Sequence, residues 1–300
     1  MMYRVEDKYI LTTKDMASME SRISTILAPD SESLQTTDTA QSSLNTNPGD
    51  TNPGHVNLGY TISSLYFDDI FDSCYNETID GNPIRTKYRI RIYNNSFDTI
   101  KLEVKHKQYN RIQKNSCLIS IDEMNSLING EEIPIISSHS SVALNSDPLN
   151  SDPLNSSNSI NDPRVAFNLA IATRGLRPKV IVTYERYAYV HPSGNVRITF
   201  DKNIRGSNTI EAFAPNNSTM VDPINLSSTA DISKSIDGSH SVNLSNLVYN
   251  YLPDTNHILE VKYDNILPKF IAQTLENNRM VQTTNSKYCM CRDATALFAH

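Results

Sequence analysis

Residues 87–107 read KYRIRIYNNSFDTIKLEVKHK, and this stretch decides the predicted fold. We predict two strands here, at residues 83–94 and 99–107. Side chains of a β-strand point alternately to the two faces of the sheet. Positions 89 and 91 are Arg, and the alternating positions 88, 90 and 92 are Tyr, Ile and Ile. Each strand therefore has one charged and one apolar face, which is typical of an antiparallel sheet covered on one side.

The same alternation recurs in other predicted strands, and within each of them the polar residues occupy every second position. The polar members of these faces are Arg4, Glu6, Lys8, Arg85, Lys87, Arg89, Arg91, Lys101, Glu103, Lys105, Lys107, Tyr184, Arg186, Arg197, Thr199, Asp201, Glu260 and Lys262. We expect strands at residues 1–11, 60–68, 83–94, 99–107, 111–121, 179–190, 195–201 and 258–263. The turn HPSG at residues 191–194 predicts a hairpin between two of them.

Helices are expected between these strands, because apolar residues there recur at helical spacing and capping signals frame them. The predicted helices are residues 13–27, a short helix that Ser120 and Glu123 begin as a capping box, a helix from Pro163 to Gly175, and residues 267–277. Tyr288 is placed in a final short strand or tail. Many antiparallel strands with helices set among them predict an α+β protein with a large sheet or barrel.

Three polar segments interrupt this pattern, at about residues 30–57, 137–162 and 214–243. They are rich in Ser, Asn, Asp, Thr and Pro, and they contain the tandem repeats TNPG and NSDPL. Such a composition cannot bury enough apolar surface to offset chain entropy. We interpret them as disordered polar insertions in a single domain that spans residues 1–300.

The overall composition excludes several classes of protein. A net charge of -6 over 300 residues argues against a general nucleic-acid binder. The four cysteines lack the paired spacing of a zinc site and are too few for a disulfide framework. The N-terminus carries charges where a signal peptide is apolar, and no stretch is long enough for a membrane span. We therefore expect a cytoplasmic protein.

The alternating charge by itself is compatible with two kinds of surface, and it slightly favours the first. A sheet with one wet face carries charged residues on that face, and their ion pairs contribute little. Two features favour a binding surface instead. The faces are biased towards Arg and Lys within an acidic protein, and cations on adjacent strands repel unless an anion lies among them. A barrel with these residues inside would hold an extended polyanion, and a few Glu would hold its metal.

A chain of phosphates fits such a surface chemically. Arg binds phosphate oxygens in bidentate fashion, and Lys adds a point charge. A divalent cation held by carboxylates and phosphates together neutralises a transferring phosphoryl group. The chain has neither of the two glycine-rich phosphate-binding motifs, and it holds only 9 Gly.

Nine motifs also carry a resemblance to a known family. They are YRVEDKYIL, SLYFDD, KYRIRIYN, KLEVKHK, VTYERYAYV, GNVRITFD, ILEVKYD, LPKFI and SKY, in this order and outside the polar insertions. Together they resemble the VTC (vacuolar transporter chaperone) domain, the polyphosphate polymerase domain of the triphosphate tunnel metalloenzymes, which are related to CYTH proteins. The resemblance implies a tunnel-shaped antiparallel β-barrel with flanking helices. Eukaryotic members of the family make polyphosphate from the γ-phosphate of ATP with a divalent metal, typically manganese.

The resemblance also implies roles for particular residues. Those expected to be catalytic are Lys8, Arg89, Arg91, Lys105, Arg186 and Arg197. Those expected to bind substrate are Tyr184, Lys114, Lys287, Glu6 and Glu103. Glu260 is expected to bind the metal, which would be Mn²⁺ or Mg²⁺.

One departure from the family pattern concerns metal binding. The tunnel family's E-x-E-x-K reads R-x-E-x-K here, with Arg4 in place of the first Glu. This fits the polymerase branch better than the hydrolase branch, and it removes one metal ligand. We expect ATP and polyphosphate as binding partners, no nucleic acid and no membrane span in this chain. Two alternative functions stay open, a metal-dependent phosphohydrolase of triphosphate or nucleotides and a non-catalytic polyphosphate-binding module. A membrane partner on another chain and the oligomeric state also stay open.

Overall fold

In the computed structural model, the described residues are 4–31, 59–109, 111–135, 162–213, 250–251, 257–276, 280–284 and 286–296. The three polar insertions, apart from a few residues at their ends, lie outside this described part. Within it, no helix is long and apolar enough to cross a membrane.

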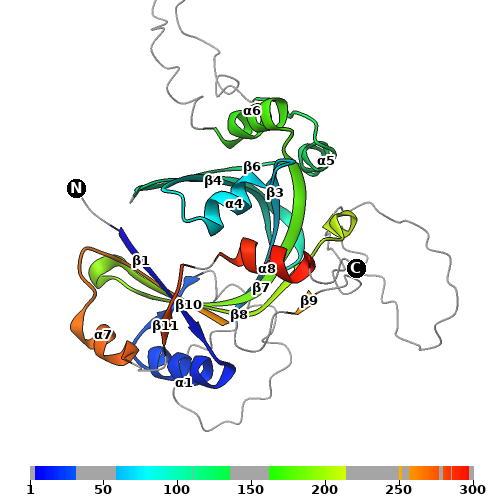
Figure 1. The fold of residues 1–300 in the computed structure, drawn as a ribbon. Helices are drawn as coiled ribbons and strands as arrows, with labels where there is room; N and C mark the ends of the chain where they lie inside the picture. Colours follow the sequence, from blue (N-terminus) through cyan, green and yellow to red (C-terminus); the bar gives the residue numbers. More distant parts are fainter. Residues whose placement is uncertain are drawn as a thin grey trace, which may run out of the picture.

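A single curved sheet forms the centre of the fold (Figure 1). Its strands pair in the order β11-β1-β10-β8-β7-β3-β4-β5-β6, and β2 and β9 add to β7 and β8. All of these pairings are antiparallel. The strands are β1 (Arg4–Leu11), β2 (Ala28–Pro29), β3 (Tyr60–Asp68), β4 (Ile84–Tyr93), β5 (Ser96–Gln108), β6 (Arg111–Leu118), β7 (Arg177–His191), β8 (Val196–Ser207), β9 (Asn250–Tyr251), β10 (His257–Asp264) and β11 (Val281–Gln282).

The helices lie around this sheet in separate groups (Figure 1). Helices α1 and α7 lie together below β1, β10 and β8, whereas α5 and α6 lie over the other end, and α4 and α8 lie between. Their bounds are α1 (Thr13–Ser24), α4 (Ser73–Ile79), α5 (Ile121–Asn129), α6 (Pro163–Arg174), α7 (Lys269–Leu275) and α8 (Lys287–Ala296). The expected α+β class, with a large antiparallel sheet and flanking helices, is confirmed.

The capping signals in the sequence operate as predicted. The hydroxyl of Thr12 accepts a hydrogen bond from the backbone of α1, and Ser120 and Glu123 form a reciprocal capping box at α5. Asp162 caps α6, which ends at Gly175 with φ 64°, a left-handed conformation that costs a glycine little. These local hydrogen bonds explain why the boundaries of α5 and α6 could be predicted so closely.

The apolar faces of the strands pack outward against the helices in two cores. Around α5 and α6 the core includes Tyr88, Ile90, Leu102, Val104 and Phe167. Around α1 and α7 it includes Met16, Ile198, Leu259, Val261 and Ile271. Because neighbouring side chains on a strand point to opposite faces, this packing turns the charged faces towards the inside of the curved sheet.

Two helices were not predicted correctly. Residues 287–296 form α8, so the placement of Tyr288 in a strand or tail is wrong. Tyr and Cys favour strands, but Tyr288, Cys289 and Cys291 are buried in the core, and tertiary packing overrides such weak preferences. The short helix α4 was missed because its N-cap, Asp72, adopts φ 55° and makes no side-chain capping bond.

The sheet does not close into the predicted barrel through backbone hydrogen bonds. Among the described strands, β6 and β11 are the ends of the path, and no backbone pairing joins them. Side chains cross this opening instead. Lys105 of β5 lies 3.9 Å from a carboxylate oxygen of Glu6 on β1, and the Lys87 ammonium donates to the Ser286 hydroxyl. The sheet thus surrounds an interior space that side chains close.

Candidate functional site: a cationic pocket inside the sheet

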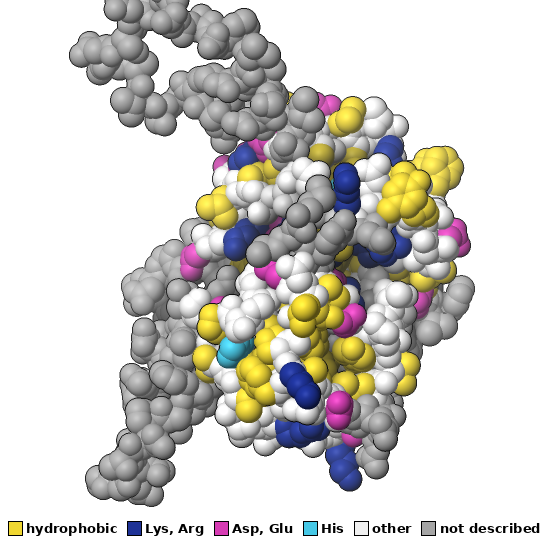
Figure 2. Space-filling view, turned by 90° about the vertical axis from the view of Figure 1, so that its left-hand side faces the viewer, with side chains coloured by type: hydrophobic (Ala, Val, Ile, Leu, Met, Phe, Trp, Pro, Cys, Tyr) yellow, Lys and Arg dark blue, Asp and Glu magenta, His cyan; other side chains and the backbone are white. Residues whose placement is uncertain are grey.

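A pocket of about 710 Å³ occupies the inner side of the curved sheet. Among the described residues, thirteen Lys and Arg side chains line it, with only two Glu. On the face of the molecule seen in Figure 2, Lys and Arg are scattered among other side chains. Of the 27 Lys and Arg in this acidic chain, thirteen therefore line this one pocket.

Strand register sets the order of these side chains along the pocket. In the β4–β5 pair, Arg89 lies opposite Glu103, and Arg91 lies opposite Lys101. Lys114 of β6 faces Lys105 across the next ladder. All of these residues lie on the faces turned away from the apolar cores, so alternation along each strand is what aims them into the pocket.

Glu103 is the buried acidic centre of one pocket wall, and it is only 1% exposed. One of its oxygens lies 2.6 Å from Arg89 Nε and 3.8 Å from Arg91 Nε, and the other contacts the Lys114 ammonium. Burial alone would raise the pKa of this carboxyl, but Arg89, Arg91 and Lys114 lower it to about 2. A charged Glu103 thereby holds three cations at the pocket surface.

Asp201 is a second buried carboxylate that holds cations at the pocket, on strand β8. Its two oxygens accept hydrogen bonds from Arg186 Nε at 2.7 Å and Nη2 at 2.8 Å, a bidentate pair. Lys287, the first residue of α8, places its ammonium 2.5 Å from the same carboxylate. The ring of Tyr184 lies under both cations, with centroid distances of 5.3 Å to Arg186 and 4.9 Å to Lys287.

Two further carboxylates, Glu6 and Glu260, face the pocket from adjacent strands β1 and β10. Lys8 lies 3.0 Å from Glu6 and 3.9 Å from Glu260, whereas Lys262 lies 4.0 Å and 3.2 Å from them. Burial opposes the charge of Glu260, yet Lys262 and Lys8 hold its pKa well below the usual range. Glu260 is thus available to a cation in ionised form, and the Glu6 carboxylate lies beside the same two lysines.

The Glu6–Glu260 pair fits a divalent cation that shares its ligands with phosphates. The chain as described has no group of three or more His, Cys, Asp or Glu that could form an all-protein metal site. Mg²⁺ and similar ions commonly use one or two carboxylates and complete their shell with waters and substrate phosphates. Beside Glu260 in register, the Thr199 hydroxyl lines the pocket, is 2% exposed and has no hydrogen-bond partner among the described residues. An orphaned oxygen here indicates room for a ligand.

Arg197 lies at one mouth of the pocket, near Tyr60 and Tyr93. Its Nη2 lies 2.7 Å from a carboxylate oxygen of Asp30 and donates to the Tyr60 hydroxyl at 3.2 Å. The rings of Tyr60 and Tyr93 follow at a centroid distance of 6.2 Å. This mouth thus combines aromatic rings with a cation that an acid balances.

The structure brings the predicted site residues together around one pocket. Eleven of them line it, and Glu103 lies beneath the cations. They are Glu6, Lys8, Arg89, Arg91, Lys105, Lys114, Tyr184, Arg186, Arg197, Glu260 and Lys287. Their roles in binding or catalysis remain predictions.

Sequence reasoning did not select several other residues that share this pocket. Arg85, Lys87, Lys101, Lys107 and Lys262 line it, as do Thr199 and Tyr66. Strand alternation had placed most of them on the charged face, but no family motif singled them out. Tyr66 is unusual, because its hydroxyl accepts a hydrogen bond from Arg89 at 2.9 Å. Burial would raise its pKa, but Arg89, Arg91 and Lys87 lower that pKa to about 8.

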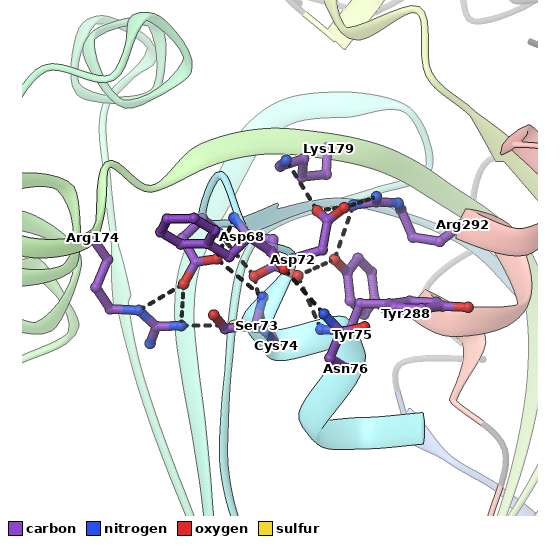
Figure 3. A network of polar contacts seen from close by, with 12 residues as sticks. Asp68, Asp72, Ser73, Cys74, Tyr75, Asn76, Arg174, Lys179, Tyr288 and Arg292 are labelled. Atoms are coloured by element: carbon purple, nitrogen blue, oxygen red, sulfur yellow. Dashed lines mark hydrogen bonds and ion pairs between the residues drawn. The ribbon is translucent and has the colours of Figure 1, made fainter. Parts of the chain in front are cut away.

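A polar network attaches α8 to the end of β3 and the start of α4 (Figure 3). Asp68 at the end of β3 accepts hydrogen bonds from the backbone amides of Cys74 and Tyr75 and, at 2.7 Å, from the Tyr288 hydroxyl. Arg292 of the same helix donates to both oxygens of Asp72. These bonds attach α8 to the start of α4. Because Lys287 is the first residue of α8, they also fix the position of its backbone.

Comparison with solved structures finds loose likenesses. The PH1819 protein from Pyrococcus horikoshii OT3 is 9% identical, with 97% of this chain and 99% of that chain covered and a TM-score of 0.41. A "putative adenylate cyclase" from Bacillus halodurans is 9% identical, with coverage of 91% and 85% and a TM-score of 0.39. At this identity and TM-score, these structures say nothing about the function of this chain.

Comparison at the level of sequence is more decisive. No curated protein matches the chain significantly. The family model of the VTC domain, however, matches residues 3–296, which is nearly the whole chain. This chain therefore belongs to the VTC domain family.

Proposed function

We propose that this protein is an ATP-dependent polyphosphate polymerase, which transfers the γ-phosphate of ATP to a growing polyphosphate chain inside the cationic pocket. The observation that supports this most directly is the gathering of thirteen cations and two Glu in one pocket of an acidic chain of the VTC family. Such a charge density suits a linear polyanion. The polymerase activity itself comes from the family resemblance.

Phosphate binding would be the task of the paired cations. Arg89, Arg91 and Lys114 are held by Glu103, and Arg186 and Lys287 are held by Asp201. Guanidinium groups retain free N–H donors after pairing with one carboxylate, and these can bind phosphate oxygens. Carboxylates at the base of each group limit side-chain freedom before the ligand arrives, which lowers the entropic cost of binding.

Phosphoryl transfer depends chiefly on positioning and on neutralising charge, with little covalent chemistry by the protein. Lys8, Lys105 and Arg197 extend the cationic lining around the two carboxylates and would orient the acceptor phosphate towards the γ-phosphate. Glu6 and Glu260, with the Thr199 hydroxyl beside them, would hold Mn²⁺ or Mg²⁺. When bound, such an ion supplies charge neutralisation and in-line positioning for the transferring group.

Purified protein incubated with ATP and Mn²⁺ tests this proposal. We expect long polyphosphate chains, resolved by gel electrophoresis, together with ADP. Release of orthophosphate without chain growth would show a hydrolase instead. Tight polyphosphate binding without turnover, unaffected by Glu260→Gln, would show a binding module. If tripolyphosphate does not stabilise the protein thermally, the pocket binds no such ligand, because any ligand of the folded state must stabilise it.

Glu260→Gln and Lys262→Met form a matched pair for the metal role. The first keeps size and hydrogen bonding but removes the ionised oxygen, and the second removes the cation that lies 3.2 Å from it. We expect Glu260→Gln to raise the Mn²⁺ concentration needed for half-maximal activity, and Lys262→Met to affect phosphate affinity instead. Equal metal dependence in both variants would contradict a metal role for Glu260.

A further inference from the structure

The cations of the pocket differ in how their charge is balanced. Nine of the thirteen have a carboxylate oxygen within 4.0 Å. In the part of the chain that the structure describes, the other four have none at that distance. These four are Arg85, Lys87, Lys101 and Lys107.

Three of these four lie together at one end of the pocket. Arg85 faces Lys107 across the β4–β5 ladder, and Lys87 follows at the next position on the same face. Lys101 lies opposite Arg91, at the far end of the same ladder. With about 3.3 Å per strand residue, the two ends are on the order of 20 Å apart. The pocket is therefore elongated, and one of its mouths carries an uncompensated cluster of Arg85, Lys87 and Lys107.

Lys87 shows the cost of this arrangement most clearly. Its ammonium donates to the neutral hydroxyl of Ser286 at 2.7 Å. Burial, with Lys8 and Arg85 nearby, lowers its pKa to about 8, although Tyr66 and Cys289 act in the opposite direction. Burial, Arg85 and Lys8 also lower the pKa of Lys107. A folded protein that keeps such cations together is poised for an anion, because the anion removes the repulsion.

The opposite mouth has a different character. There the ammonium of Lys101 lies over the ring of Tyr93, 4.9 Å from its centroid, and Asp30 balances Arg197. Aromatic rings and a paired cation suit the base, sugar or leaving end of a nucleotide better than a bare phosphate chain. The two mouths thus differ in the charge that they offer.

We propose that Arg85, Lys87 and Lys107 bind the phosphates of a linear chain beyond those held by the paired cations, so that a growing polyphosphate leaves the pocket through their mouth. This inference rests on the proposed function. It specifies the end of the pocket at which the product chain leaves, and it assigns the recognition of chain length to these three residues. The ligand class is inorganic polyphosphate longer than tripolyphosphate.

Calorimetric titration of the full chain with two ligands tests this inference. The ligands are inorganic tripolyphosphate and a polyphosphate of defined, longer chain length, and the readout is the ratio of their affinities. Lys87→Met and Lys107→Met should each lower the preference for the long chain about tenfold, the value of one charge-assisted contact. Lys101→Met is the matched control, because it removes the same group from the same face of β5 at the other mouth.

The outcomes separate this inference from the proposed function. If neither ligand binds the wild-type protein, both fail. If both ligands bind but the preference persists in Lys87→Met and Lys107→Met, only the inference is overturned. An equal loss in Lys101→Met would also overturn it, because the chain would then have no preferred mouth. Methionine keeps the apolar stem of lysine, and an unchanged Tm confirms that each variant is folded.

A pH series adds an independent readout. Lys87 loses its charge as the pH rises through about 8, so the preference for long chains should fall between about pH 7 and about pH 9. Tyr66 acquires negative charge over the same interval and acts in the same direction. Lys87→Met distinguishes the two, because only the contribution of Tyr66 remains. A wild-type preference that is independent of pH would count against Lys87.

Discussion

Two buried carboxylates, Asp68 and Glu103, show how one kind of group serves two purposes in this protein. Asp68 is 0% exposed and Glu103 is 1% exposed. Asp68 accepts hydrogen bonds from three backbone amides and from the Tyr288 hydroxyl. Among the described residues, Glu103 instead forms its ion pairs with long cationic side chains, which include Arg89 and Lys114. Backbone donors hold Asp68 outside the pocket, whereas cations surround Glu103 within its wall.

The difference lies in what else the partners can do. Amides that donate to Asp68 are fully used, so this carboxylate stabilises the chain and offers nothing to a ligand. The cations that surround Glu103 keep N–H donors that Glu103 does not use. This carboxylate therefore orients them towards a ligand in the pocket. We therefore expect replacements at Asp68 to affect stability, and replacements around Glu103 to affect ligand binding and activity.

Asp68→Ala should have the largest effect. It leaves the amides of Cys74 and Tyr75 and the Tyr288 hydroxyl unsatisfied in the core, at a cost of about 3 kcal/mol or more. Chemical denaturation should show this loss. Asp72→Asn is the control, because it keeps a residue that tolerates the left-handed φ of 55° and removes only half-exposed ion pairs. Equal losses in both variants would contradict a special role for Asp68.

Arg89→Ala should come next, with loss of activity in a folded protein. Removing one preorganised donor to a developing charge costs about 100-fold in rate or more. The Tm should not fall steeply, because this cation is one of several around Glu103. Exposed Arg22 on α1 provides the control, and Arg22→Ala should leave polyphosphate synthesis unchanged. If Arg89→Ala unfolds the protein, Arg89 is a structural ion-pair member instead.

Glu103→Gln should have an intermediate effect that depends on pH. The pKa of Glu103 falls from 4.5 to about 2 in the folded state, so its stabilising contribution is complete above about pH 4.5 and is lost as the pH falls through about 2. The difference in unfolding free energy between wild type and Glu103→Gln should shrink over that window. A difference that stays constant from neutral pH to about pH 2 would mean that charge is not the source of the stabilisation.

Tyr288→Phe should have the smallest effect, about 1 kcal/mol, because it removes one hydrogen bond and keeps the ring stacked on Tyr66. Since Tyr288 follows Lys287, we also expect KM to rise while kcat changes little. Tyr75→Phe is the matched control, because its hydroxyl donates to Asp293 at the surface. If Tyr75→Phe raises KM as much, the attachment of α8 to Asp68 does not position Lys287.

Much of the fold followed from local patterns. Strand alternation predicted the two faces of β4 and β5, and the caps at Ser120, Asp162 and Gly175 predicted helix boundaries, because both are set by neighbours within a few residues. Helix α8 and the short α4 escaped prediction. Core contacts specify α8, and α4 begins at a left-handed Asp72 without a side-chain cap.

The sequence by itself determined which residues share a face, because the period of a strand is a local property. It also carried the family motifs that selected eleven of the pocket residues. Only the tertiary structure decided that the charged face turns inward, since it is the folded sheet that packs its apolar face into two cores and lines a pocket with the charged face. Tertiary structure likewise decided that Asp201 meets Lys287 from another part of the chain, and that Arg85, Lys87 and Lys107 have no acid beside them among the described residues. Pairings of this kind depend on contacts between distant residues, which no local period encodes.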